Sequence, residues 1–286
     1  MEIILTGTAA SFNIPAFRCI CDVCSQSRHS RDRKLKRRNS CAVVTGDRGE
    51  KILIDAPPQF MNQLEQCGIE DTGIDYLLLS HRHEDHILGL FYMLSLKKSK
   101  GGIVSSPLKV YLGADTYNSI TSNFKTLANV KKMEDLEGII EFNTITDRVE
   151  FQTGGLSITP LETNHLNAKY FNKTGKKEQS FGFHISGKGK NFYYLVDAAK
   201  TLPAGTIAFM KKNRPDCIVI DCTYEKADES SGHGDIESVL SLRSLFPGGR
   251  MIVSHLGHQN LPPDKLAVIF DSEGIEVGYD GLKVQL

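Results

Sequence analysis

The sequence predicts an α/β protein in which a mixed β-sheet core is covered by helices. Roughly ten short apolar runs rich in β-branched and aromatic residues recur along the 286 residues, which is typical of strands. Five segments between them carry apolar residues at three- and four-residue spacing, as helices with one buried face do. The first half opens with hairpin-like strands and the second half alternates strands with helices, so a mixed sheet is expected.

The predicted elements follow one another without an internal repeat or a Gly/Ser/Pro-rich linker, so residues 1–286 are expected to form one domain. Strands are predicted at residues 3–5, 41–44, 51–54, 76–79, 109–112, 156–160, 192–196, 217–220, 251–254 and 274–279. Helices are predicted at residues 58–66, 87–98, 201–212, 234–245 and 263–272. Two long segments, 11–39 and 164–179, have no predicted element, and loops of this length in a compact domain tend to be functional or flexible.

The composition is ordinary for a globular protein and has no global charge that would attract nucleic acid. Hydrophobic residues make up 40%, and Lys plus Arg equal Asp plus Glu at 34 each. The basic run at 28–38 is better explained as a solvated charged segment than as a nucleic-acid patch. No apolar stretch is long enough to span a membrane and the N-terminal apolar run is too short for a secretory signal, so we expect a cytoplasmic protein. A homodimer remains open.

Residue types that bind metals are concentrated in the hexapeptide HRHEDH at residues 81–86. It follows the strand predicted at 76–79 and precedes the helix predicted at 87–98. An abrupt turn there directs the side chains to the carboxyl edge of the sheet, where α/β proteins usually hold their sites. Imidazole and carboxylate suit zinc, manganese or iron, and three histidines plus an aspartate exceed what one ion takes from one segment. The hexapeptide therefore predicts two divalent metal ions.

Further ligand candidates stand where other predicted strands end. His165 follows one apolar run, and Asp197 and His255 each end another. A single histidine after a strand is more often a surface residue, but together with the hexapeptide these three residues form a coherent set of metal ligands.

The order of these residues resembles the HxHxDH…H…D…H pattern of the metallo-β-lactamase superfamily, over nearly the whole chain. This resemblance implies an αββα sandwich, with two mixed β-sheets and helices on the outer faces. It implies that the first ion is bound by His81, His83 and His165, the second by Asp85, His86 and His255, and that Asp197 bridges both. Asp55, in the segment LIDA, matches the acid that supports the histidine segment in that superfamily.

A second, softer ligand set is the CxCxxC motif of Cys19, Cys21 and Cys24. Three cysteines this close together do not suit an ordinary disulfide framework, so they point to a metal, and a structural zinc site needs four ligands. The motif, with LIDAPPQF and the HLGH near the end of the chain, resembles the PhnP-type cyclic phosphodiesterases. That resemblance implies that His258 is the fourth ligand and that a zinc-binding loop spans about 15–40. The remaining thiols are expected in or near the core: Cys41, Cys67, Cys217 and Cys222.

The resemblance implies a metal-dependent hydrolase that cleaves a small phosphodiester, with a cyclic nucleotide or ribose phosphate as the analogy. Two zinc or manganese ions can bridge a hydroxide, lower its pKa and hold the phosphoryl oxygens, while the departing alkoxide needs a further acid. His233 resembles the auxiliary histidine of PhnP-like proteins, which implies phosphate contact or protonation of the leaving group. Asp221 is expected to orient His233, and Asp85 to act through the second ion.

Three other functions fit parts of the sequence. A tRNA-processing nuclease shares the metal pattern, but the neutral charge balance and the lack of an obvious tRNA-binding addition argue against it. A lactonase or thioesterase uses the same fold on carboxyl esters. The cysteine segment also resembles that of PqqB proteins of quinone-cofactor biosynthesis, which would bind a metal or an intermediate without phosphodiesterase activity. That family departs from the full HxHxDH pattern, whereas this chain keeps it. The basic segment 164–179 leads into Ser180-Phe181-Gly182-Phe183, which resembles a strand start of the PhnP-type family, and the segment is expected to cover the site and alter specificity.

Overall fold

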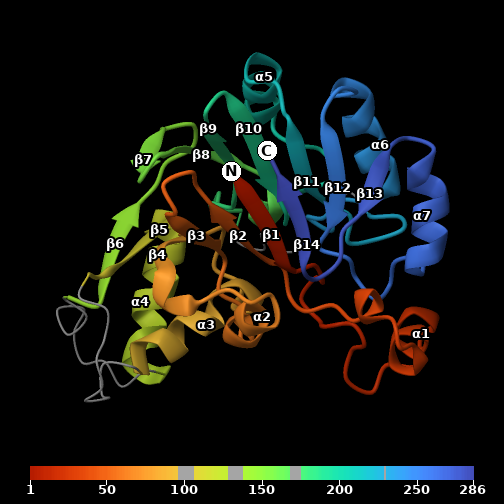
Figure 1. The fold of residues 1–286 in the computed structure, drawn as a ribbon, viewed down its shortest axis with the longest axis horizontal. Helices are drawn as coiled ribbons and strands as arrows, with labels where there is room; N and C mark the ends of the chain where they lie inside the picture. The colour runs from red at the N-terminus through yellow and green to blue at the C-terminus, as the bar shows by residue number, and fades with distance from the viewer. Residues whose placement is uncertain (96–105, 128–137, 168–174, 229) are drawn as a thin grey trace.

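Two seven-stranded β-sheets pack face to face in the computed structural model of the chain, and helices cover both outer faces (Figure 1). The structure describes residues 1–95, 106–127, 138–167, 175–228 and 230–286. The predicted αββα sandwich of two mixed sheets is confirmed.

The first sheet has the strand order β14-β1-β2-β3-β4-β5-β6. Pairing is antiparallel from β14 to β3 and parallel from β3 to β6. Its strands are β1 (Glu2–Gly7), β2 (Cys41–Thr45), β3 (Lys51–Ile54), β4 (Ile74–Leu79), β5 (Leu108–Leu112), β6 (Ile140–Thr144) and β14 (Leu282–Gln285).

The second sheet repeats this design with the order β13-β12-β11-β10-β9-β8-β7. Pairing is parallel from β13 to β10 and antiparallel from β10 to β7. Its strands are β7 (Phe151–Thr153), β8 (Leu156–Glu162), β9 (Phe181–Gly187), β10 (Lys190–Leu195), β11 (Cys217–Asp221), β12 (Arg250–Ser254) and β13 (Ile275–Val277).

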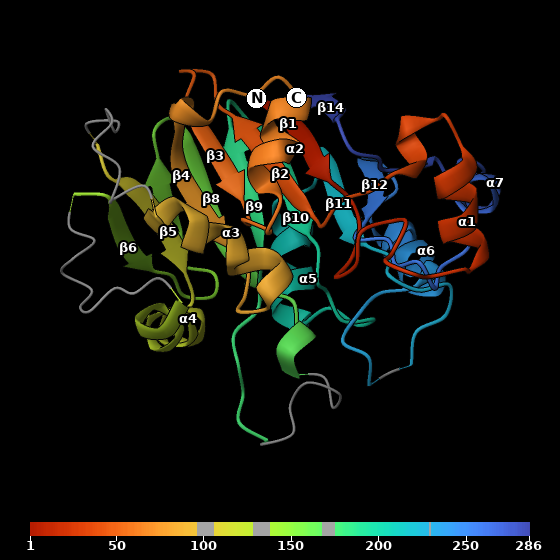
Figure 2. The ribbon, with the colours of Figure 1, turned by 90° about the horizontal axis from the view of Figure 1, so that it is seen from below.

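The helices divide between the two outer faces, as the two views in Figures 1 and 2 show. The first sheet is covered by α2 (Phe60–Gln66), α3 (Glu84–Ser95) and α4 (Ala114–Leu127), and the second by α5 (Ala204–Lys212), α6 (Ile236–Leu245) and α7 (Pro263–Asp271). Helix α1 (Asp22–His29) lies at the opposite end of the sandwich from α4. No helix in the described part of the chain is long and apolar enough to cross a membrane.

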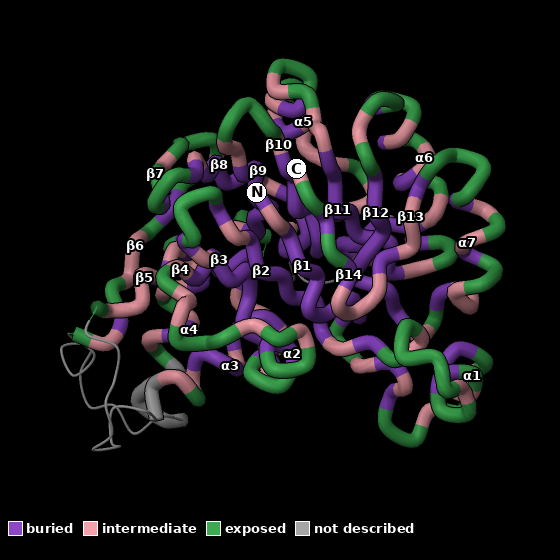
Figure 3. The backbone as a smooth tube through the Cα atoms, in the orientation of Figure 1, coloured by how far each residue is buried: buried purple, intermediate pink, exposed green. Residues whose placement is uncertain are grey.

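The central strands are buried on both faces, which is why they appear in the sequence as continuous apolar runs (Figure 3). Successive side chains of a strand point to opposite faces. In β4, Leu78 therefore packs between the sheets and Leu77 packs beneath the helices. In β10, Tyr194 and Tyr193 divide in the same way.

The sequence patterns missed the elements whose apolar signal is weak. The segment 11–39 was predicted to be irregular, but it contains α1, a short helix that buries few side chains and lacks an apolar stripe. Strands β6, β7 and β14 and helix α4 were also missed; β14 is four residues long with alternate residues exposed. Strand β9 begins at Phe181, within the segment 180–183 that resembles a strand start. The strand predicted at 274–279 is too long, since β13 ends at Val277. In the segment 164–179, residues 168–174 lie outside the described residues.

Candidate metal centre

The predicted ligands gather at the carboxyl ends of strands in the two sheets. Asp55 follows β3, the HRHEDH segment follows β4, and Asp197 and His255 follow β10 and β12. Asp55, Asp197 and His255 have positive φ angles of 62°, 50° and 56°. Such left-handed backbone is uncommon for residues other than glycine, and it persists where the surrounding structure fixes a residue for a function.

His81, His83 and His165, predicted to bind the first ion, converge on one point. The Nε2 atom of His81 lies 2.9 Å from Nδ1 of His83, and Nε2 of His165 lies 3.2 Å from the same Nδ1. Burial lowers the pKa of all three imidazoles. The neutral form is thereby favoured, and its ring nitrogen carries the lone pair that a metal ion needs.

The second predicted group meets the first at Asp197. The Oδ2 atom of Asp197 lies 3.0 Å from Nε2 of His86 and 3.1 Å from Nε2 of His255. Its other oxygen, Oδ1, lies 3.5 Å from Nε2 of His165 in the first group. Asp85 completes the second group, with Oδ2 at 3.4 Å from Nε2 of His86. The carboxylate of Asp197 thus stands between the two groups, as a bridging ligand would.

The charges of this centre favour ionised carboxylates. Burial by itself would raise the pKa of Asp197, but the charges of His255 and His86 hold it well below its usual range. Burial likewise opposes ionisation of Asp85, yet His86 lowers the Asp85 pKa to about 2. The carboxylates act on the histidine in the opposite sense. Burial would lower the pKa of His86, but the charges of Asp197 and Asp85 raise it well above its usual value. Protons on His86 and His255 therefore balance the charge of the carboxylates, and a bound cation would replace these protons.

Three buried atoms of the second group indicate that a cation belongs there. The Oδ2 atom of Asp197 lies 3.0 and 3.1 Å from the Nε2 atoms of His86 and His255, yet none of the three atoms forms a hydrogen bond, although buried polar atoms normally do. The ligand atoms of Asp85, His86 and His255 lie within 4.8 Å of one another. Imidazole and carboxylate donors suit zinc or manganese, so the residues present fit a divalent ion.

Asp55 and Ser80 fix the orientation of two of these histidines. Asp55 is fully buried and accepts hydrogen bonds from Nδ1 of His86 at 2.8 Å and from the hydroxyl and backbone N–H of Ser80 at 2.9 and 2.8 Å. The Ser80 Oγ atom also lies 3.0 Å from Nδ1 of His81. Contacts at Nδ1 direct each Nε2 atom into the centre. Sequence reasoning named Asp55 and missed Ser80, whose only signal is its position before HRHEDH.

On the opposite side of the centre, Asp221 orients side chains as Asp55 does. It is fully buried, and its Oδ2 atom lies 3.0 Å from Nδ1 of His233 while its Oδ1 accepts from the Thr223 hydroxyl at 2.8 Å. The same hydroxyl lies 2.8 Å from Nδ1 of His255. The backbone carbonyl of Gly232 lies 2.8 Å from Nδ1 of His165. The structure thus brings Asp221 and His233 together as predicted; Thr223 and Gly232 carry no sequence signal of their own.

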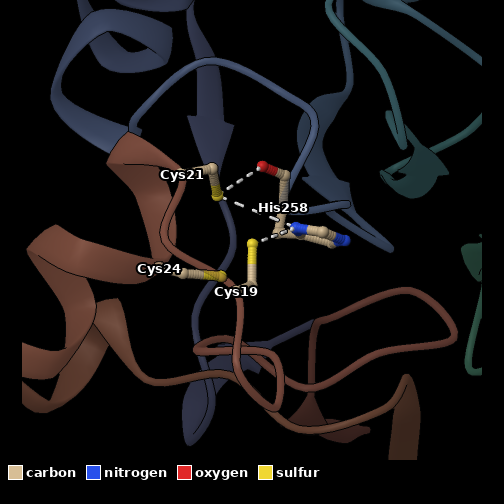
Figure 4. A group of neighbouring side chains, drawn as sticks. All are labelled: Cys19, Cys21, Cys24 and His258. Carbon is tan, nitrogen blue, oxygen red and sulfur yellow. Dashed lines mark hydrogen bonds between the residues drawn. The ribbon is translucent and has the colours of Figure 1, made fainter.

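The side chains of Cys19, Cys21, Cys24 and His258 form a separate group, which we call the cysteine cluster (Figure 4). The Nδ1 atom of His258 lies 3.2 Å from the sulfur of Cys19 and 3.7 Å from that of Cys21. All four ligand atoms lie within 4.8 Å of one another, and the cysteines are not joined by disulfides. Three sulfurs and one imidazole are a donor set that tetrahedral zinc accepts.

Protonation in the cysteine cluster also fits a cation. Hydrogen bonds with Cys21 lower the pKa of Cys19. Burial raises the pKa of Cys24 to about 12, so this thiol ionises at neutral pH only beside a positive charge. The backbone N–H of Ala16 donates to the Cys24 sulfur at 3.2 Å and supports its negative form.

The remaining thiols and part of the basic run have structural surroundings. Cys41, Cys217 and Cys222 are buried and Cys67 is half-buried, in keeping with their prediction as core or near-core residues. In the basic run, Arg28 donates to the backbone carbonyls of Cys19 and Ala16. The buried Arg37 donates to the hydroxyl of Thr8 at 2.8 Å.

The αββα sandwich, with a centre of histidines and carboxylates at its strand ends, defines a protein of the metallo-β-lactamase fold. A family model described as a β-lactamase superfamily domain matches residues 50–256, so the chain belongs to that family. The matched region includes the predicted ligands from His81 to His255 but excludes the cysteine cluster.

Relatives and solved structures resemble the chain over its full length. The coenzyme PQQ synthesis protein B of Methylococcus capsulatus is 24% identical over 318 residues, which cover 100% of both chains. The crystal structure of a new diphosphatase from the PhnP family has a TM-score of 0.78 and 22% identity, covering 100% of this chain and 97% of the other. Zinc-bound PqqB from Methylobacterium extorquens has a TM-score of 0.78 and 21% identity, covering 100% of both. These similarities to structures establish the fold.

Proposed function

We propose that the chain is a phosphodiesterase that hydrolyses a small phosphodiester at the centre formed by His81, His83, Asp85, His86, His165, Asp197 and His255, which we call the histidine–carboxylate centre. Two divalent ions held there would supply Lewis acidity towards the phosphoryl oxygens and lower the pKa of water. His81, His83 and His165 would hold one ion, Asp85, His86 and His255 the other, and Asp197 both.

The observation that carries this proposal is the pair of His233 and Asp221. His233 lies beside the centre, with Nδ1 at 3.0 Å from Asp221 and 3.9 Å from Asp197 Oδ1. Because the carboxylate of Asp221 engages Nδ1, Nε2 is the atom that would give a proton to the substrate. The alkoxide that departs from an alkyl phosphodiester needs such a proton. A thiolate or a nitrophenolate is stable as an anion and leaves without one.

In the proposed reaction, the oxygen of water bonds to phosphorus as the bond from phosphorus to the alkoxide oxygen breaks. His233 transfers its Nε2 proton to that oxygen, so the product is a neutral alcohol. The proton released by the attacking water passes to solvent, from which His233 regains its own. The role of Asp221 is to hold the imidazole ring in place throughout.

The proposal is tested with protein loaded with zinc or manganese and assayed on alkyl and nitrophenyl phosphodiesters, a thioester and a lactone. Phosphodiesters should be the better substrates. The His233→Ala variant should keep its metal content and lose about 10²–10⁴-fold in kcat on alkyl esters, with little loss on nitrophenyl esters, whose leaving group needs no proton. Hydrolysis of the thioester or lactone alone would reject the phosphodiesterase.

A second candidate is a part in quinone-cofactor biosynthesis, favoured by the full-length match to proteins named for coenzyme PQQ synthesis. Such a protein would bind metal through the same residues without cleaving phosphodiesters. Metal-loaded protein that is inactive on every ester, and that binds a quinone-cofactor intermediate, would favour this candidate.

A further inference from the structure

A cavity of about 400 Å³ opens beside His233, on the side of the molecule that carries the cysteine cluster. This volume is within the range of roughly 300–1,000 Å³ typical of small-molecule sites. One wall includes Tyr224, Ser231 and His233. Other lining residues, which include Phe12, His258 and Gln259, belong to the segments that hold the cysteine cluster.

The three segments that line the cavity are held together by backbone hydrogen bonds. The N–H of Gly257 donates to the carbonyl of Thr223 at 3.0 Å, and the N–H of Ala10 donates to the carbonyl of Leu256 at 3.1 Å. A Cβ atom on Gly257 would lie 2.7 Å from the Thr223 carbonyl oxygen, so this close approach requires glycine. The cavity is therefore a built feature that connects the His233 side of the centre with the cysteine cluster.

The lining of the cavity is polar and aromatic, without formal charge from acids, lysine or arginine among the residues that the structure describes. The ring of Phe12 meets the ring of His258 edge-on at 6.0 Å, and the ring of Tyr224 meets that of His233 at 6.0 Å. Ser231 and Gln259 add hydroxyl and amide groups. This combination matches a molecule with an apolar ring face and polar edges. Neither lysine nor arginine is among the described lining residues to pair with a second phosphate or a carboxylate, and the proton of His233 is given to the departing oxygen.

We propose that this cavity, which we call the leaving-group pocket, binds an uncharged, ring-bearing alcohol or phenol as it departs from the phosphoryl group, and that Phe12 selects for the ring. The proposal rests on the proposed function, because His233 can protonate an oxygen only if the departing group lies on its side of the centre. A leaving group with an added negative charge is disfavoured there.

The first test compares two methyl phosphodiesters on metal-loaded protein, one with a 4-nitrophenyl and one with a 3-carboxy-4-nitrophenyl leaving group. The two phenols differ mainly in the added carboxylate. We expect kcat/KM to be at least about tenfold lower for the carboxylated ester, mainly through KM, because the pocket removes the carboxylate from water and its described lining offers no lysine or arginine. Equal or better cleavage of the carboxylated ester would overturn the proposal.

The second test replaces Phe12 and uses a matched control. Phe12→Ala should raise KM for the 4-nitrophenyl ester by about 3–10-fold with kcat nearly unchanged, the size expected for one aromatic contact. Phe17→Ala is the control, since Phe17 lies on the same segment, is 94% exposed and is not part of the lining. Equal effects of the two variants would overturn the assignment of Phe12.

A binding measurement separates failure of this inference from failure of the proposed function. Calorimetry with metal-loaded protein measures the Kd of 4-nitrobenzyl alcohol for the wild type, for Phe12→Ala and for Phe17→Ala. Binding of the alcohol that is weakened by Phe12→Ala alone supports the pocket even if no ester is hydrolysed. Binding that Phe12→Ala leaves unchanged, or no binding, overturns it, whatever the hydrolytic activity.

Discussion

The histidine–carboxylate centre and the cysteine cluster each bring together residues that could hold a metal ion, but they are supported in different ways. The centre lies at the ends of buried strands, and residues such as Asp55 and Thr223 hold its imidazole rings at Nδ1. The cluster lies between a loop with one short helix and the segment after β12, and Cys19 and Cys21 are partly exposed. A centre with such support keeps its geometry without metal, whereas a loop site depends on its ion for structure.

The largest effect should come from removing a ligand of the centre. Asp85→Ala and His86→Ala should each lower kcat by roughly 10³-fold while the fold survives, because one ion contributes several kcal/mol of transition-state stabilisation. Elemental analysis and steady-state kinetics measure both losses. Glu84→Ala, an exposed neighbour at the start of α3, serves as the control and should retain activity. Near-normal turnover in either ligand variant would refute the two-ion mechanism.

Removing a ligand of the cysteine cluster should act on stability instead. Cys21→Ser should lose one zinc per chain and several kcal/mol of unfolding free energy, because metal binding and ordering of the loop are coupled. Denaturant unfolding and zinc analysis of Cys21→Ser and of Cys67→Ser, whose thiol lies outside the cluster, measure the difference. The comparison between the two regions would fail if Cys21→Ser lost kcat and kept its stability.

Asp280 contacts both ends of the cysteine-bearing loop. Its carboxylate accepts hydrogen bonds from the Thr8 hydroxyl at 2.8 Å and from the backbone N–H of Arg38 at 2.7 Å. Burial raises the Asp280 pKa from 3.8 to about 6, despite these hydrogen bonds. The folded chain therefore binds this proton more tightly than the unfolded chain. The resulting stabilisation is complete below about pH 4 and is lost as pH rises through 6, by at most about 3 kcal/mol at about 1.4 kcal/mol per pKa unit.

Unfolding titrations of the wild type and of Asp280→Asn between pH 4 and 7 isolate this effect, because other groups contribute equally to both. The wild type should lose stability relative to the variant as pH rises. A similar titration of Asp271→Asn, at an exposed position at the end of α7, should match the wild type. A difference between wild type and Asp280→Asn that stays constant with pH would contradict the assignment.

The smallest effect should come from a residue that supports the centre without binding metal. Asp55→Asn should weaken metal binding by about 10–100-fold, because the Nδ1 contact that orients His86 is weakened. Competition with a chelator measures the affinity, and Asp75→Asn, exposed on the strand that leads to the centre, is the control. An unchanged affinity in Asp55→Asn would mean that the backbone alone positions the ring.

The amino-acid sequence by itself determined the buried central strands and the residues at their ends. Buried strands such as β4 and β10 appear as apolar runs because both of their faces pack, and the HRHEDH segment stands out because its ligand residues are adjacent. Elements with weak apolar signals, such as α1 and β14, were missed for the corresponding reason, since their positions are fixed by contacts with other segments.

Tertiary structure decided which distant residues meet. Cys19 and His258 are 239 positions apart, and Thr223 contacts His255 across 32. No periodicity encodes such pairs, because they follow from how the strands align and how the loops close between them. The leaving-group pocket is of the same kind: its walls come from three separate segments, and they form a cavity because Gly257 allows two backbones to approach and Thr223 accepts the resulting hydrogen bond.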